Sequence, residues 1–98
     1  PGMILSNEPG YYREGAFGIR IENLIVVTTA QAEQGRDMLG FETLTLCPID
    51  MRAVDRTALS RDEIAWIDTY HARVRDEISP LVDAATRDWL FRATSPIG

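Results

Sequence analysis

The first half of the chain has the hydrophobic pattern of β-strands. Apolar side chains dominate residues 3–5 and, almost without interruption, residues 17–27. Runs of this kind are typical of strands that are covered on both faces. Residues 13–16 are polar and contain a glycine, so we expect the two runs to pair as antiparallel strands. A third strand is predicted at residues 41–46, and the polar residues 30–40 are interpreted as the loop that precedes it.

The second half of the chain changes to a helical period. Ser60 and Glu63 have the spacing of a capping box, in which each side chain binds the other residue's amide. Apolar or aromatic residues then recur at positions 64, 67, 71, 74 and 78, which places them in one stripe on a helix. Trp66 and Tyr70 widen this stripe. The helix is predicted to end at Ser79 and Pro80, because proline lacks the amide that a helix needs.

A second, shorter helix is expected at about residues 84–94. Asp83 is placed to cap its first turn. Its predicted buried side chains are Ala85, Trp89, Leu90 and Ala93. The order of these elements indicates an α+β fold, with antiparallel strands followed by two C-terminal helices.

Composition limits the classes of function. The chain has 98 residues and a net charge of -5, without a single lysine. This acidic balance argues against a nucleic-acid partner. No run of apolar residues reaches the length of a membrane span. The single cysteine, Cys47, excludes an internal disulfide and fits a reducing compartment, and we interpret it as a small buried residue.

Two carboxylates stand out because they interrupt the apolar runs. Glu8 follows the first run and Glu22 lies within the second. The two-residue period of a strand places Ser6 and Glu8 on one face, and likewise Arg20 and Glu22. If the strands pair antiparallel, both carboxylates can point into one pocket with Arg20 beside them. A divalent ion would relieve their repulsion, although a surface pair, or a pair neutralised by Arg20, has the same spacing.

The motifs around these glutamates resemble a known family. Residues 1–12, ending Asn-Glu-Pro-Gly-Tyr-Tyr, and residues 18–23, Gly-Ile-Arg-Ile-Glu-Asn, resemble the C-terminal part of aminopeptidase P, the Xaa-Pro aminopeptidase. This enzyme belongs to the pita-bread metallopeptidases. Residues 41–50 resemble the strand that follows in the family. The tail of the chain, which contains Trp66 and Trp89 and ends Thr-Ser-Pro-Ile at residues 94–97, resembles the terminal extension of the family's longer, eukaryotic-cytosolic-like branch.

The resemblance implies a site with two divalent metal ions and five protein ligands. Glu8 matches the glutamate that binds one ion, and Glu22 matches the glutamate that bridges both. Arg20 matches an arginine that orients acidic ligands or substrate, so it is a candidate for catalysis and for substrate binding. Tyr12 is a further candidate for substrate binding. The ions are expected to be Mn²⁺, with Zn²⁺, Co²⁺ or Mg²⁺ as alternatives.

The resemblance also implies that the chain is a piece of the enzyme. Residues 1–50 correspond to the last strands of the pita-bread domain, and residues 51–98 to a connector and a helical extension. The other three ligands, two aspartates and a histidine, lie upstream in the family. The only histidine here, His71, falls on the helical stripe and is interpreted as a packed residue. We therefore expect this piece alone to be inactive and to hold no metal tightly.

The predicted function of the parent protein is removal of an N-terminal residue that precedes proline. Its expected partners are peptides with proline at the second position, the upstream part of the same protein, and a second copy in a dimer. The expected location is the cytoplasm. The alternative is a non-catalytic pita-bread-like module for protein binding or dimerisation. Trp66 and Trp89 could anchor such an interface, or could simply pack the tail.

Overall fold

The computed structural model describes all 98 residues. The chain forms two compact units, Pro1–Thr45 and Leu46–Gly98. The first unit contains only strands and the second only helices, so the predicted α+β class is confirmed. The units divide between Thr45 and Leu46, and the domain boundary predicted after residue 50 stays a prediction. Each unit is described by itself.

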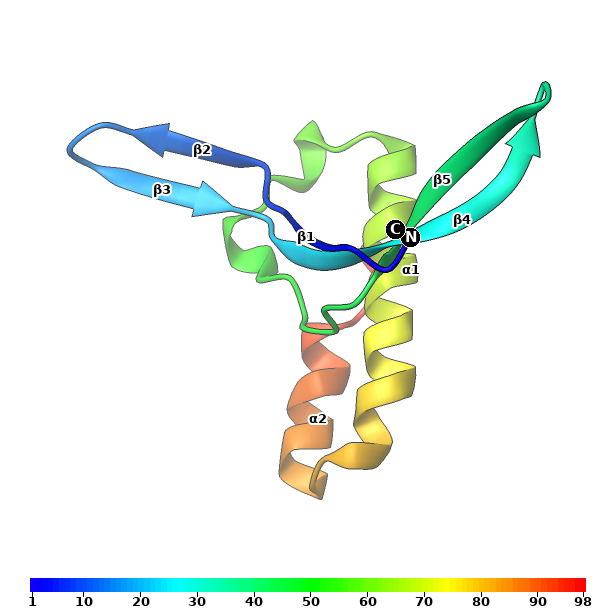
Figure 1. Ribbon diagram of the computed structural model, residues 1–98. Coiled ribbons are helices and arrows are strands. Elements are labelled where there is room, and N and C mark those ends of the chain that lie inside the picture. The colour runs from blue at the N-terminus through cyan, green and yellow to red at the C-terminus, as the bar shows by residue number, and fades with distance from the viewer. The chain divides into compact units, whose positions relative to one another are not determined.

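The first unit consists of two antiparallel sheets, built from two long chain paths and one further strand, β5 (Arg36–Thr43). One path contains β1 and β2, and the other contains β3 and β4 (Figure 1). β1 pairs with β4 in a three-stranded sheet of order β1–β4–β5, and β2 pairs with β3 in a separate hairpin. The antiparallel pairing of the two apolar runs is therefore as predicted. The bounds are β1 Ile4–Asn7, β2 Gly10–Arg13, β3 Phe17–Arg20, β4 Asn23–Glu33 and β5 Arg36–Thr43.

Each of the two chain paths is interrupted once, at the same level, between the two sheets. Residues 8 and 9 separate β1 from β2, and residues 21 and 22 separate β3 from β4. Pro9 contributes to this break because it has no amide proton to donate to a neighbouring strand. The carbonyl of Pro9 still accepts a hydrogen bond from the amide of Ile21, at 3.1 Å. The two paths therefore stay side by side through the interruption.

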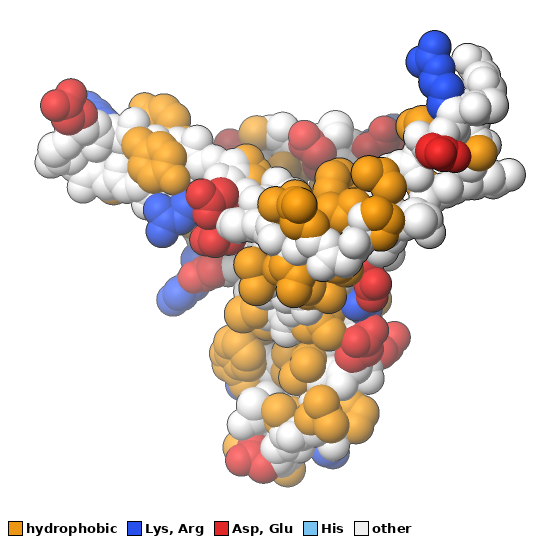
Figure 2. Space-filling model, in the orientation of Figure 1, with side chains coloured by type: hydrophobic (Ala, Val, Ile, Leu, Met, Phe, Trp, Pro, Cys, Tyr) orange, Lys and Arg blue, Asp and Glu red, His pale blue; other side chains and the backbone are white.

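The expectation that these strands are covered on both faces is wrong for the chain as it stands. Every residue of β1, β2 and β3 is exposed, and hydrophobic side chains lie at the surface over these strands (Figure 2). The first unit contains no helix that could cover its sheets. The continuous apolar pattern predicted the strands correctly, but the side chains that it would bury have no covering layer in this unit.

The predicted loop at residues 30–40 is also wrong. β4 continues to Glu33 and β5 begins at Arg36, so only Gln34 and Gly35 form the turn. Both have positive φ angles, 52° and 74°. This is the backbone of a type I′ turn, whose twist matches that of the flanking strands. The polar residues therefore belong to a long exposed hairpin. The pairing of its two strands shifts register between Ala30 and Glu33.

The second unit begins with two short turns of 3₁₀-helix, η1 (Met51–Ala53) and η2 (Arg56–Ala58). Asp50 and Asp55 cap them by accepting amide hydrogen bonds. The carboxylate of Asp50 also accepts hydrogen bonds from the Arg52 guanidinium, and this contact, together with the bond from the Arg52 amide, lowers the pKa of Asp50 to about 2. The charged connector is thus ordered by local capping.

The two helices begin and end close to the predicted residues. α1 spans Arg61–Ile78, and the capping box between Ser60 and Glu63 is present. The 3₁₀ turn η3 (Ser79–Leu81) follows where Pro80 was expected to end the helix. α2 spans Ala84–Ala93, and the Asp83 carboxylate accepts from the Thr86 amide. Neither helix has the length and hydrophobicity needed to cross a membrane.

The core of the second unit follows the predicted stripe of α1. Tyr70, Val74 and Leu90 form its buried cluster. Trp89 and Ala85 were predicted to be buried, but both are exposed, Trp89 by 53%. The reason is that Leu90 is the buried residue of α2, and its neighbour Trp89 projects about 100° away around the helix axis. Trp66 is likewise half-exposed and stacks on Tyr70, with ring centroids 5.4 Å apart.

His71 is fully buried in this unit, as expected for a packed residue. Its Nε2 accepts a hydrogen bond from the Ile49 amide at 3.0 Å. Burial lowers the pKa of His71, and the acceptor role of Nε2 places the ring proton of the neutral form on Nδ1. Next to it, the Tyr70 hydroxyl donates to the Cys47 carbonyl at 2.7 Å. Cys47 itself is exposed, which corrects the expectation of a buried residue.

Candidate functional site

Glu8 and Glu22 lie at the interruption of the two chain paths, directly opposite each other. The register on one side pairs Asn7 with Asn23, and on the other side it pairs Gly10 with Arg20. The two intervening residues on each path keep this register, so Glu8 faces Glu22 across the interruption. The sequence predicts each glutamate within a strand, whereas in the structure Glu8 lies directly after β1 ends and Glu22 directly before β4 begins.

The two carboxylates converge on one hydroxyl group. Ser6 Oγ lies 2.7 Å from Glu8 Oε2 and 3.1 Å from Glu22 Oε1. A hydroxyl has a single proton to donate, so the two carboxylates share one donor. Both glutamates therefore point to the same side of the sheet. The two-residue period of a strand predicts that Ser6 and Glu8 share a face, but it does not predict the contact between Ser6 and Glu22.

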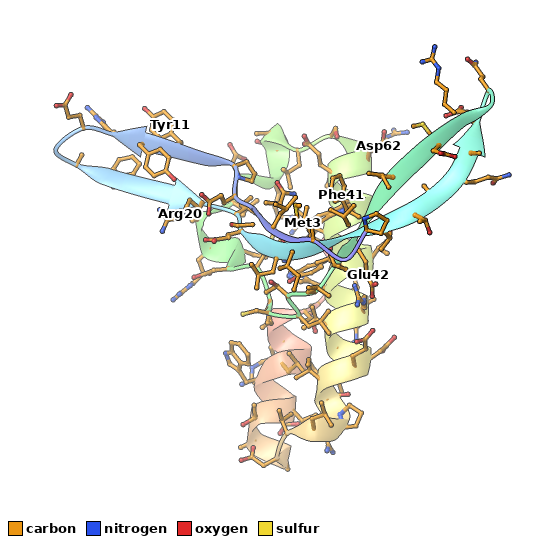
Figure 3. All side chains as sticks on the ribbon, viewed as in Figure 1. Met3, Tyr11, Arg20, Phe41, Glu42 and Asp62 are labelled. Atoms are coloured by element: carbon orange, nitrogen blue, oxygen red, sulfur yellow. The ribbon has the colours of Figure 1, made fainter.

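Arg20 lies beside these carboxylates, at the end of β3 (Figure 3). Its Nε is 3.7 Å from Glu22 Oε2, and both side chains are about half exposed, by 50% and 46%. A hydrogen bond to the Tyr12 side chain is the largest cause that raises the pKa of Arg20, and the charges of Glu22 and Glu8 act in the same direction. The arrangement therefore links Tyr12 to Arg20 and Arg20 to Glu22.

Two glycines leave the space that Tyr12 occupies in this arrangement. A Cβ atom on Gly18 would lie 2.8 Å from Cδ1 of the Tyr12 ring, which is too close for any real contact. A Cβ atom on Gly10 would lie 3.0 Å from both the Tyr12 hydroxyl and the Arg20 Cγ. The ring of Tyr12 thus lies over one glycine, and its hydroxyl lies at the other. Both glycines are part of the motifs on which the resemblance rests.

The arrangement is chemically suited to a divalent cation. It presents two carboxylates with hard oxygen donors on one side of the sheet, and their mutual repulsion would be relieved by a positive ion between them. The chain contains no group of three or more His, Cys, Asp or Glu side chains placed to hold a metal ion. Within this chain, Glu8 and Glu22 are a pair of carboxylates with no third such side chain beside them.

Comparison with known proteins places the chain in a family. Residues 1–29 match "Metallopeptidase family M24", and residues 37–97 match "C-terminal region of peptidase_M24". Aminopeptidase P2 of Arabidopsis thaliana is 48% identical over 100 residues, which cover 98% of this chain and 14% of the plant protein. A probable Xaa-Pro aminopeptidase P of Laccaria bicolor is 45% identical over 101 residues, which cover 98% of this chain and 16% of the fungal protein.

A solved structure agrees with these matches. The X-prolyl aminopeptidase of Caenorhabditis elegans, described as a cytosolic enzyme with a di-nuclear active site, superimposes with a TM-score of 0.78 at 36% identity. The alignment covers 96% of this chain and 16% of the nematode enzyme. The chain therefore spans about one sixth of the relatives that it matches. On the strength of both family matches and these identities, the chain belongs to the M24 family of metallopeptidases, of which it contains the C-terminal region.

Proposed function

We propose that the protein containing this chain is an Xaa-Pro aminopeptidase, which removes an N-terminal residue that precedes proline. The observation that carries the proposal is the convergence of Glu8 and Glu22 on the Ser6 hydroxyl. The names of the relatives supply the reaction and the substrate class. The expected substrates are peptides with proline at the second position.

The metal-binding roles are those that the family resemblance implies, and the convergence of the two carboxylates supports them. We assign Glu22 to two divalent ions and Glu8 to one of them, with the remaining ligands supplied by the upstream part of the same protein. Hard oxygen donors fit Mn²⁺, and Zn²⁺, Co²⁺ or Mg²⁺ are alternatives. The chemistry that the ions supply when bound is the activation of a water molecule for attack on the carbonyl carbon of the Xaa-Pro bond. By itself, the 98-residue chain is expected to be inactive.

The residues beside the carboxylates have positioning and binding roles. The Arg20 guanidinium lies 3.7 Å from Glu22 Oε2 and attracts that carboxylate by its charge, which adds to the hold of Ser6 on the other oxygen. The Tyr12 side chain in turn holds Arg20. Both side chains are substantially exposed, so each also has a polar group available to a peptide substrate. We therefore keep Arg20 as a catalytic and substrate-binding candidate and Tyr12 as a substrate-binding candidate.

The cellular location and the oligomeric state of the protein are proposed from its relatives and from its exposed side chains. A cytoplasmic location is proposed because the nematode structure is described as that of a cytosolic enzyme. A homodimer is proposed because Trp66 and Trp89 are half-exposed, and large aromatic side chains are enriched at protein interfaces. The acidic net charge continues to argue against nucleic acid as a partner.

A comparison of two glutamate variants in the full-length protein tests the proposed reaction. We expect the wild type to cleave peptides with proline at the second position and to ignore matched peptides with alanine there. Chelation should abolish cleavage, and Mn²⁺ should restore it. Glu22→Gln should reduce kcat/KM by more than about 100-fold. Loss of a residue that only orients a metal ligand typically lowers activity by about 10–100-fold, and loss of the ligand itself should lower it more.

Glu14→Gln is the matched control for this experiment. Glu14 lies in the turn between β2 and β3, so the variant removes the same charge from the same unit without touching the site. Its activity should equal that of the wild type. Full activity of the Glu22→Gln variant would contradict the proposal, and so would a purified wild-type protein that cleaves neither peptide. The second result would favour the non-catalytic binding or dimerisation module.

A further inference from the structure

The Ser6 side chain contacts both carboxylates of the candidate site. It lies on β1 two residues before Glu8, and its hydroxyl reaches across to Glu22 on the other chain path. The hydroxyl thus connects two acidic side chains that are separated by 14 residues in sequence but opposed in register.

Opposed carboxylates on neighbouring strands normally repel each other, and like charges at such positions destabilise a sheet. Each side chain would turn away into solvent if nothing held it, because both are exposed. The Ser6 hydroxyl opposes that tendency, because its single proton lies within hydrogen-bond distance of both carboxylates and each of them is attracted to it. The contacts at 2.7 Å and 3.1 Å therefore select the conformation in which both groups face one point.

We propose that Ser6 is a positioning residue that arranges Glu8 and Glu22 for the metal ions before the ions bind. This inference rests on the proposed function, because it concerns the same pair of ligands. Each carboxylate has one oxygen bound to Ser6 and its second oxygen free of that contact. A ligand pair that is already in place loses less conformational entropy when the ion arrives, which strengthens binding. Groups that orient metal ligands typically change affinity by about 10–100-fold when they are removed.

The test compares Mn²⁺ affinity, measured by titration calorimetry on the metal-free full-length protein, between two substitutions at one position. Ser6→Ala removes the hydroxyl, and Ser6→Thr keeps it on a side chain that suits a strand better. We expect Ser6→Ala to weaken Mn²⁺ binding by about 10-fold. Ser6→Thr should bind within about 3-fold of the wild type, because the hydroxyl is retained.

Thr29→Ala is the matched control. Thr29 is an exposed β4 residue of the same sheet, so this variant removes a hydroxyl far along the strand from the carboxylates. It should bind Mn²⁺ like the wild type, and all three variants should keep the wild-type melting temperature. The inference is overturned if Ser6→Ala binds as tightly as the wild type, if Ser6→Thr is as weak as Ser6→Ala, or if Thr29→Ala is weakened equally.

Measuring the Mn²⁺ affinity of the Glu22→Gln variant as well distinguishes the proposed metal role of Glu22 from the proposed positioning role of Ser6. If Glu22→Gln loses Mn²⁺ affinity while Ser6→Ala keeps it, the proposed metal role stands and the role of Ser6 is wrong. If Glu22→Gln binds Mn²⁺ like the wild type, the carboxylate is not a ligand, and the proposed function fails together with the inference. If both variants are weakened and Ser6→Thr is restored, both are supported.

Discussion

Pro9 and the residues around it decide where the acidic pair can form. Because proline cannot donate to a neighbouring strand, β1 ends before it, and Glu8 leaves the regular sheet at the same level as Glu22. The unchanged register across this interruption brings the two side chains face to face. The pair therefore depends on a local break in two strands rather than on a strand that is buried on both faces.

A substitution at Gly18 tests whether Tyr12 positions Arg20 for the reaction. The new Cβ atom in Gly18→Ala would lie 2.8 Å from the Tyr12 ring, so the ring must move and release Arg20. We expect kcat/KM for a peptide with proline at the second position to fall by about 10-fold, because small misplacements of positioning groups slow reactions strongly. Steady-state kinetics on the full-length protein measure this effect.

The control for Gly18→Ala is its behaviour in a Tyr12→Ala background. If the glycine acts through the ring, the second substitution should add little to the first, since the two residues share one interaction. Fully additive losses would mean that Gly18 acts by some other route. Wild-type kinetics for Gly18→Ala alone would show that the position of Tyr12 is irrelevant to the reaction.

Single residues differ in how far the sequence predicts their contacts. The shared face of Ser6 and Glu8 follows from the two-residue period of a strand, and so does that of Arg20 and Glu22. The contact between Ser6 and Glu22 does not, because it depends on the register of two paths and on the rotamers of both side chains. The Tyr12 ring over Gly18 is a similar case. A cross-strand contact requires the pairing to be known first.

Among the elements, the β4–β5 hairpin was the least predictable. Its polar sequence resembles a loop, yet a two-residue turn with positive φ angles allows pairing to continue to Glu33 and Arg36. Gln-Gly is a weaker signal for this turn than Asn-Gly, because asparagine adopts left-handed angles more readily. The capping box of α1 was predicted correctly because it depends only on local sequence.

Substitutions in this turn should change the stability of the hairpin in opposite directions. Gly35→Ala places a Cβ atom on a residue with a φ angle of 74° and should destabilise the hairpin by about 1 kcal/mol. Gln34→Asn should stabilise it slightly, because asparagine favours the left-handed region. Native-state hydrogen exchange of the β4 and β5 amides measures the free energy of opening.

Gly40→Ala is the matched control for the turn. Gly40 lies in the same hairpin with an ordinary φ angle, and an added Cβ atom would meet its nearest neighbour, Thr28 Oγ1, at 3.4 Å. The opening free energy should therefore change much less than in Gly35→Ala. Equal effects of the two alanines would rule out backbone strain at the turn as the cause.

Helix α1 holds the connector through His71, and this contact should depend on pH. The pKa of His71 is lowered from its ordinary value of 6.5, chiefly by burial. The unfolded chain therefore binds a proton at a higher pH than the folded unit does. The stabilisation is fully present above about pH 6.5 and is lost as the pH falls through the lower pKa of the folded state. Protonation of Nε2 also removes the acceptor for the Ile49 amide.

Hydrogen exchange at Ile49 in the full-length protein measures this effect. After correction for the intrinsic rate, protection of this amide should fall between about pH 7 and pH 5 in the wild type. His71→Gln offers an acceptor that does not titrate, so its protection should stay constant over the same range. A wild-type profile as flat as that of the variant would mean that His71 does not titrate in this range.

At the scale of the whole molecule, the chain spans about one sixth of the length of its relatives, and its two units differ in how much of their surface is buried. The helical unit has a buried cluster of its own, whereas the strands β1, β2 and β3 are exposed throughout. The hydrophobic pattern predicts strands that are buried on both faces. It does not indicate which residues pack against those faces, because a pattern along one segment contains no information about its partner. In the same way, the metal site that we propose at the two carboxylates requires further ligands, because this chain offers no third one beside them.

The most direct measurement is anomalous diffraction from crystals of the full-length protein grown with Mn²⁺, recorded at the manganese absorption edge. We predict two manganese peaks in each protein copy, with carboxylate oxygens of Glu22 coordinating both and a carboxylate oxygen of Glu8 coordinating one. The absence of manganese at these two side chains, or carboxylates that point to opposite sides of the sheet, would contradict the assignment of this site.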